Sequence, residues 1–153
     1  MAWFPLYVNL EGNNCTIFGG NDEAAGYASV LLSFGAKVTV VSPDLCDKLA
    51  QMDRDLKIRY IPRRYFRGDC SSCYICIAST GSDALNISIS DECKARAISV
   101  CVASPSAYGT FRFPVTALQG DITMSISGVP DDTRSRDLLE EGLRRAAETI
   151  TVK

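Results

Sequence analysis

The sequence predicts an α/β fold built on a parallel, doubly wound sheet. Short apolar runs alternate with segments whose apolar residues recur at helical spacing, and a glycine turn joins the first run to the first such segment. This alternation is typical of parallel strands connected by right-handed crossovers. After Pro105 the pattern changes, and two strands followed by a helix predict a C-terminal β-hairpin and helix.

The expected elements follow one another along the chain, each with its own signal. Residues 16–19 form a buried strand that ends in glycines, and residues 22–34 form a helix that stops at Gly35. Residues 37–41 are β-branched, which predicts the second strand. The elements that follow are a helix at 44–52, strands at 57–61 and 73–78, a helix at 82–97 with Ser82 as its N-cap, and a strand at 99–103.

The C-terminal third is expected to be an appendage to the sheet. Residues 113–118 and 123–127 have the spacing of a hairpin around the turn Gln119-Gly120-Asp121. Residues 135–149 form the closing helix, whose mixed charged face covers apolar positions. We expect this part to serve as a dimerisation element.

Composition excludes several classes of function. The 153 residues are 46% hydrophobic and 22% charged, and the net charge of −2 gives no footprint for nucleic acid or an anionic membrane. Apolar runs are too short to span a bilayer and the start lacks a secretory signal, so we expect a cytoplasmic protein. Histidine is absent, which removes the commonest general base and zinc ligand.

The glycine turn at residues 19–24 is the sharpest functional signal. It reads GGNDEA between a predicted strand and a predicted helix, which is the context of a dinucleotide-binding fingerprint. Gly19 permits the tight turn, and the start of the helix offers free amides to a pyrophosphate. Asn21 replaces the middle glycine and acidic residues follow it, so a tight turn without a ligand is the alternative.

The end of the second strand indicates which dinucleotide to expect. A ribose-binding acid is expected near this point, and Asp44 follows the strand closely. No arginine stands beside it to accept a 2′-phosphate, which favours NAD over NADP.

Together these segments resemble the N-terminal module of siroheme synthase and its free-standing relatives, the precorrin-2 dehydrogenases. The resemblance covers about residues 3–145 and depends on the order of residues 4–10, 15–24, 35–43, 60–65, 77–80 with Asn86, 111–115 and 122–128. It implies a Rossmann-type sheet, a homodimer, and oxidation of precorrin-2 to sirohydrochlorin with NAD as hydride acceptor. Residues 1–104 would be the NAD-binding domain and residues 105–153 a dimerisation and substrate-side segment.

The resemblance also assigns site residues. Those expected to bind the cofactor are Gly19, Gly20, Asn21, Asp22, Ser42, Asp44, Ser79 and Thr80, and those expected to face the tetrapyrrole are Ser104 and Arg112. Arg63, Arg64 and Arg67 are instead expected on a solvated loop face.

The chain departs from the family where catalysis is expected. The family has an aspartate after its fifth strand, whereas this chain has Ala103-Ser104, so the catalytic residue is unknown. Ferrochelatase activity is not expected, because removal of pyrrole protons needs a base. The segment 127–132 differs as well, with Asp131 near the family's serine. Two alternatives stay open: a catalytically degenerate relative that binds NAD or a tetrapyrrole, and an unrelated redox or NAD sensor that uses Cys70.

The seven cysteines are an odd number, which argues against a closed disulfide framework. Cys70, Cys73 and Cys76 form a CxxCxxC motif, which could bind a metal or an iron–sulfur cluster with a further ligand from Cys93, Cys101 or outside. We expect no metal, because a strand over residues 73–78 would place Cys73 and Cys76 on opposite faces. Cys70 would precede that strand, in an exposed position.

Overall fold

A computed structural model describes residues 3–127 and 133–151 of the chain. The chain divides into two compact units, Met1–Phe111 and Arg112–Lys153. This division falls after residue 111, later than the boundary expected after residue 104. Asp131 lies outside the described residues.

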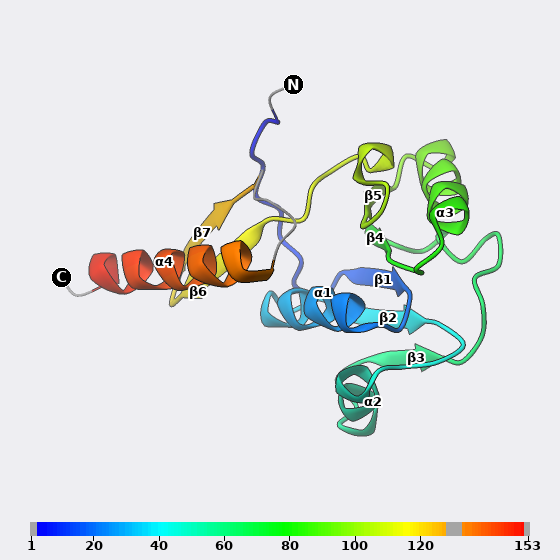
Figure 1. Ribbon diagram of the computed structural model, residues 1–153, viewed down its shortest axis with the longest axis horizontal. Coiled ribbons are helices and arrows are strands. Elements are labelled where there is room, and N and C mark those ends of the chain that lie inside the picture. Colours follow the sequence, from blue (N-terminus) through cyan, green and yellow to red (C-terminus); the bar gives the residue numbers. More distant parts are fainter. Residues whose placement is uncertain (1–2, 128–132, 152–153) are drawn as a thin grey trace. The chain divides into compact units, whose positions relative to one another are not determined.

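The first unit contains a five-stranded parallel sheet with the strand order β3-β2-β1-β4-β5 (Figure 1). Its strands are β1 (Asn14–Phe18), β2 (Lys37–Val41), β3 (Arg59–Ile61), β4 (Ile75–Ala78) and β5 (Ser99–Val102). The predicted α/β class and parallel sheet are confirmed. The order reverses between β1 and β4, so this pair of strands is the switch point of the doubly wound sheet.

Three α-helices and a short 3-10 helix complete this unit: α1 (Asp22–Ser33), α2 (Asp47–Arg54), α3 (Asp83–Ala95) and η1 (Ser106–Tyr108). Ser82 caps α3 as predicted, with its hydroxyl oxygen accepting a hydrogen bond from the amide of Leu85. Right-handed crossovers place α1 and α2 on one face of the sheet and α3 on the other.

Several boundaries differ from the prediction by a few residues, and at two of them, the starts of α2 and β4, turns in the preceding loop compete with the regular element. Helix α2 begins at Asp47 rather than at residue 44, since the preceding loop is held by a hydrogen bond from the amide of Cys46 to the oxygen of Gly20. Strand β4 begins at Ile75 rather than at residue 73. Turn hydrogen bonds from the amide of Ser71 to Gly68 and from the amide of Cys73 to Cys70 keep those residues out of the sheet.

The core beneath α3 joins three strands to that helix. Phe18 of β1, Ala78 of β4 and Val102 of β5 belong to one buried cluster with Ile89 and Cys93 of α3. Alternate residues of a strand point to opposite faces, so Phe18 and Thr16 share the face that α3 covers. This layer fixes α3 and the loop in front of β4 against the sheet.

The second unit is the hairpin and helix expected from the sequence. Strands β6 (Val115–Gln119) and β7 (Ile122–Ile126) are antiparallel, and Gly120 takes φ +57° in the turn between them. Helix α4 (Thr133–Thr151) packs against this hairpin and carries ion pairs from Glu141 to Arg144 and Arg145.

No helix in the described part of the chain has the length and apolar character needed to cross a membrane. All seven cysteines are free thiols. Of these, Cys46 and Cys73 are half-buried and the rest are buried.

Candidate functional site

The switch point brings the ends of β1 and β4 into direct contact. Gly19 follows β1 with φ +130°, a conformation that residues with a side chain rarely adopt. A Cβ added there would lie 1.9 Å from the backbone oxygen of Ser79, which follows β4. Ligands of doubly wound sheets bind at such a crevice. Glycine is therefore required here for the close approach of two strand ends.

Gly20 makes a similar contact with the loop that follows β2. A Cβ at this position would lie 1.8 Å from the backbone oxygen of Asp44 and 2.8 Å from the Oγ atom of Ser42. The Ser42 side chain is buried at this junction, whereas Asp44 is exposed. The structure thus brings the expected residues of the β1 and β2 loops together at one edge of the sheet.

Asn21 is the N-cap of α1. Its Oδ1 atom accepts a hydrogen bond of 2.8 Å from the amide of Ala24, so the side chain folds back onto the helix. Helix geometry gives the amides of Asp22 and Glu23 no partner within α1. These two amides and the positive end of the helix dipole form the part of the loop that suits an anion.

Ser79 contributes its hydroxyl group to the protein itself. It is 1% exposed, and its Oγ donates to the Oε2 atom of Glu23 at 2.9 Å. The Oε1 atom of Glu23 accepts a hydrogen bond of 3.1 Å from the hydroxyl of Tyr27. The Glu23 carboxylate therefore lies between the first turn of α1 and the end of β4. The sequence shows that Glu23 is an acidic residue in the first turn of the helix. It gives no sign that Ser79 is its hydrogen-bond partner.

Thr80 and Ser104 are linked through Asn86, a residue that is 2% exposed. The Oδ1 atom of Asn86 accepts from the amide of Thr80 at 3.0 Å and from its hydroxyl at 2.8 Å. Its Nδ2 atom donates to the backbone oxygen of Ser104 at 2.8 Å. The family resemblance includes Asn86 but assigns it no role. In the structure, Asn86 connects the residues that follow β4 and β5.

The structure therefore gathers the expected cofactor-binding residues at the carboxyl ends of β1, β2 and β4. Ser104 follows β5 and joins this edge through Asn86. Arg112 begins the second unit. The free amides that begin α1 suit an anion, whereas the charges of Asp22 and Glu23 oppose one, and Asp44 is exposed at the same edge.

A comparison with protein families gives this edge a context. The family model described as "Putative NAD(P)-binding" matches residues 6–115, a range that spans β1 to the start of β6.

The chain belongs to this NAD(P)-binding family.

Proteins similar to this chain include siroheme synthases. The protein of that name from Thioalkalivibrio sulfidiphilus (strain HL-EbGR7) is 32% identical over 127 residues, which are 83% of this chain and 26% of the relative. That of Baumannia cicadellinicola subsp. Homalodisca coagulata is 27% identical over 150 residues, 98% of this chain and 32% of the relative. The chain thus spans about a quarter to a third of these relatives.

The solved structure titled SirC, precorrin-2 dehydrogenase, superimposes with a TM-score of 0.70 at 20% identity. The superposition covers 94% of this chain and 71% of the SirC chain, so it includes residues of both units. The family resemblance expected from the sequence is confirmed, and the fold of this NAD(P)-binding family member agrees with that of SirC.

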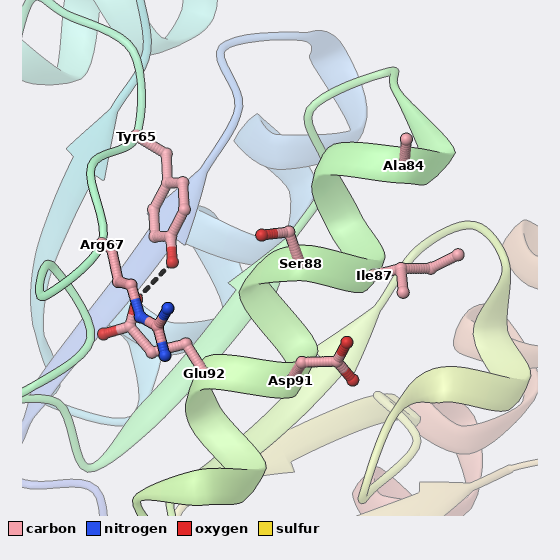
Figure 2. A pocket seen from close by; sticks show the side chains of 7 residues that line it. All are labelled: Tyr65, Arg67, Ala84, Ile87, Ser88, Asp91 and Glu92. Atoms are coloured by element: carbon pink, nitrogen blue, oxygen red, sulfur yellow. Dashed lines mark hydrogen bonds between the residues drawn. The ribbon is translucent and has the colours of Figure 1, made fainter.

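A pocket of about 450 Å³ lies away from the glycine turn, between α3 and the loop after β3 (Figure 2). The loop supplies Tyr65 and Arg67, and the helix supplies Ala84, Ile87, Ser88, Asp91 and Glu92. The expected cofactor-binding residues are not among those that line it. Arg67 is exposed, as expected for a residue on a solvated loop face. It also lines this pocket, beside Glu92.

Glu92 is the buried acid of this pocket, at 6% exposure. It accepts hydrogen bonds from the hydroxyl of Tyr65 and, at 2.9 Å, from the amide of Gly68, and its ion pair with Arg96 measures 3.1 Å. Burial raises the pKa of Glu92, but these donors outweigh it, and the pKa lies below its ordinary value. One side of the pocket is therefore formed by the Glu92 carboxylate. Its hydrogen bonds hold it in place, and Arg96 already compensates its negative charge.

The arrangement of the cysteine motif differs from the prediction. Cys70 is buried rather than exposed, and its Sγ atom lies within 4.8 Å of those of Cys76 and Cys93. Cys73 precedes β4, and its Sγ donates to the hydroxyl oxygen of Thr16 at 2.9 Å. Because Cys73 is outside the strand, the opposite-face argument against a metal was wrong.

Proposed function

We propose that this chain is an NAD-dependent precorrin-2 dehydrogenase module, which oxidises precorrin-2 to sirohydrochlorin. The observation that carries the proposal is the contact between Gly19 and Ser79 at the switch point, directly before the amides that begin α1. Doubly wound domains bind dinucleotides at this position. The sequence likeness to siroheme synthases supports the choice of substrate.

NAD is the proposed cofactor, and it would supply the hydride acceptor for the reaction. The amides of Asp22 and Glu23 would hold its pyrophosphate, and the carboxylate of Asp44 would accept hydrogen bonds from the ribose. Gly20 keeps the loop around Asp44 close to this helix start. A carboxylate at this position disfavours the additional phosphate of NADP by charge repulsion.

The substrate side of the proposed site is the end of β5. Ser104 and Arg112 are the residues that would face the tetrapyrrole, and a guanidinium pairs well with a substrate carboxylate. Ala103 and Ser104 supply no carboxylate where the related family has an aspartate. Hydride transfer is carried by the cofactor, whereas iron insertion needs a base for pyrrole protons, so we propose no ferrochelatase activity. The second unit would form a homodimer interface.

Calorimetric titration with NAD and NADP tests the cofactor assignment. Asp44→Ala should weaken NAD binding about tenfold or more, because a hydrogen bond to a charged group is lost. Glu23→Gln should strengthen it, since a negative charge near the pyrophosphate is removed while an acceptor for Ser79 is kept. Asp47→Ala, at an exposed position on α2, is the matched control. Equal NAD affinity in all four proteins would reject the assigned site.

The reaction itself is tested by incubating the protein with precorrin-2 and NAD and following the absorbance of sirohydrochlorin. We expect a rate above that of the protein-free control. A rate equal to that control, with NAD binding intact, would instead establish the second candidate, a catalytically degenerate relative that binds NAD or a tetrapyrrole. The missing carboxylate at Ala103 and Ser104 is the observation that favours this second candidate.

A further inference from the structure

Three buried cysteines from two separate parts of the sequence meet beneath α3, and a fourth, Cys73, lies beside them. The Sγ atoms of Cys70, Cys76 and Cys93 all lie within 4.8 Å of one another, and these residues are fully buried. Cys73 lies nearby, and its Sγ contacts the hydroxyl of Thr16, the residue that pairs with Cys76 across β1 and β4. The group therefore combines the loop before β4, the strand itself and α3.

From this arrangement we propose that Cys70, Cys73, Cys76 and Cys93 bind one thiophilic divalent metal ion such as Zn²⁺. The proposal is independent of NAD and precorrin-2, because none of these residues belongs to the glycine turn or to the end of β5. A Cys-x-x-Cys pair with further distant ligands occurs in structural zinc sites, whereas the full run of three cysteines is also found in iron–sulfur proteins, so the distances must decide between them.

The distances favour a single ion over an iron–sulfur cluster. A zinc–sulfur bond of about 2.3 Å in a tetrahedron places the sulfur atoms roughly 3.8 Å apart. The three closest sulfur atoms already lie within 4.8 Å of one another, so a small inward movement completes three sides of such a site. The iron and sulfide atoms of a cluster would have to push these buried side chains apart.

The fourth position is open to Cys73. Its Sγ is held by the hydroxyl of Thr16 at 2.9 Å, and Thr16 pairs with Cys76 across β1 and β4. Thr16 therefore points to the same face of the sheet as Cys76. In the proposed site, the half-buried Cys73 side chain would leave Thr16 and supply the fourth thiolate.

Binding of a divalent ion requires these thiols to lose their protons. Uncompensated thiolates in this core would be costly, so a bound cation is what allows several of them to ionise together. Binding would release the thiol protons to solvent without any redox change.

Cobalt titration of the reduced, metal-free full chain tests the site. Co²⁺ is the probe, because thiolate ligands give it intense near-ultraviolet charge-transfer absorption that grows with the number of sulfur atoms bound. We expect saturation at one ion per chain, an intensity that indicates four thiolates, and loss of the signal on adding Zn²⁺. Absence of a charge-transfer band in the wild-type chain would overturn the proposal.

Matched variants locate the ligands. Cys70→Ala and Cys93→Ala keep the core apolar and should weaken cobalt binding at least about tenfold, since even loss of a partner outside the ligand sphere costs that much. Cys101→Ala, at an equally buried cysteine outside the group, and Cys46→Ala should bind as the wild type does. Retention of binding in Cys70→Ala, or its loss in Cys101→Ala, would contradict the assignment.

Further measurements on the wild type and on variants complete the test. Thermal unfolding of the wild type should shift upward on adding Zn²⁺, and that of Cys70→Ala should not, as circular dichroism can follow. Unchanged cobalt binding in Cys73→Ser would overturn the four-cysteine site. Inorganic sulfide in anaerobically purified protein, or a disulfide among these residues together with no metal binding after reduction, would overturn the single-ion assignment.

Discussion

The side-chain amide of Asn86 donates a hydrogen bond to the backbone oxygen of Ser104 at 2.8 Å, while its Oδ1 atom accepts one from the amide of Thr80 at 3.0 Å. One buried side chain therefore connects the residues that follow β4 and β5. A polar contact thus adds to the apolar packing of Ala78 and Val102 where these two strands end.

Asn86→Ala is expected to lower the free energy of unfolding by about 1–3 kcal/mol, because it leaves the Thr80 amide and the Ser104 oxygen without their partner. Urea denaturation measures the change. Ser88→Ala on the exposed side of the same helix is the control and should stay within about 0.5 kcal/mol of wild type. Equal stability of the two variants would show that the Asn86 contacts are unimportant.

The contact between Glu92 and Tyr65 should be measurable as a coupling energy. Tyr65→Phe removes the donor of this hydrogen bond and Glu92→Ala removes its acceptor, so we expect the double variant to lose less stability than the sum of the single losses, by about 0.5–3 kcal/mol. Chemical denaturation of the four proteins gives the coupling. Asp91→Asn, which lines the same pocket without this contact, should combine additively with Tyr65→Phe. Additive losses for the first pair would contradict the observed contact.

Substituting two glycines should change stability in opposite directions. Gly20→Ala places its Cβ 1.8 Å from the Asp44 oxygen, so the loop must move and the protein should be destabilised. Gly26 lies within α1 with nothing within 4 Å of an added Cβ, and Gly26→Ala should stabilise the protein by about 0.4–1 kcal/mol. Melting temperatures of the two variants decide this. A stabilised Gly20→Ala protein would mean that the close approach of the two loops is absent.

Cys15 should resist alkylation while Cys46 reacts. Burial raises the pKa of Cys15 from 9.0 to about 11, and the side chain is 1% exposed. Only the thiolate is nucleophilic, so Cys15 should remain unmodified at neutral and mildly alkaline pH, until the pH approaches about 11. Mass spectrometry after brief iodoacetamide treatment identifies the labelled residues. Labelling of Cys15 as fast as that of the half-buried Cys46 would contradict this burial.

Local signals were sufficient for the order and type of the elements. The β-branched run at 37–41 coincides with β2, and Ser82 caps α3 where its sequence context predicted a helix start. Boundaries at α2 and β4 differed, because hydrogen bonds from Cys46 to Gly20 and within residues 68–73 formed turns instead. A pattern of residue types carries no information about the Cys46 contact, because its partner Gly20 lies elsewhere in the chain, whereas the turns within residues 68–73 are local alternatives to the strand.

The sequence by itself determined that a glycine turn opens a helix after the first strand, because both the turn and the helix start depend on neighbouring residues. Tertiary structure alone decided that Ser79 binds Glu23 and that Cys93 approaches Cys70 and Cys76. Such pairs arise from the packing of α1 and α3 on the sheet, which joins residues far apart in sequence. The direction of the side chains before β4, and with it the candidate metal site, depends on which residue begins that strand. Only the tertiary structure shows that this residue is Ile75.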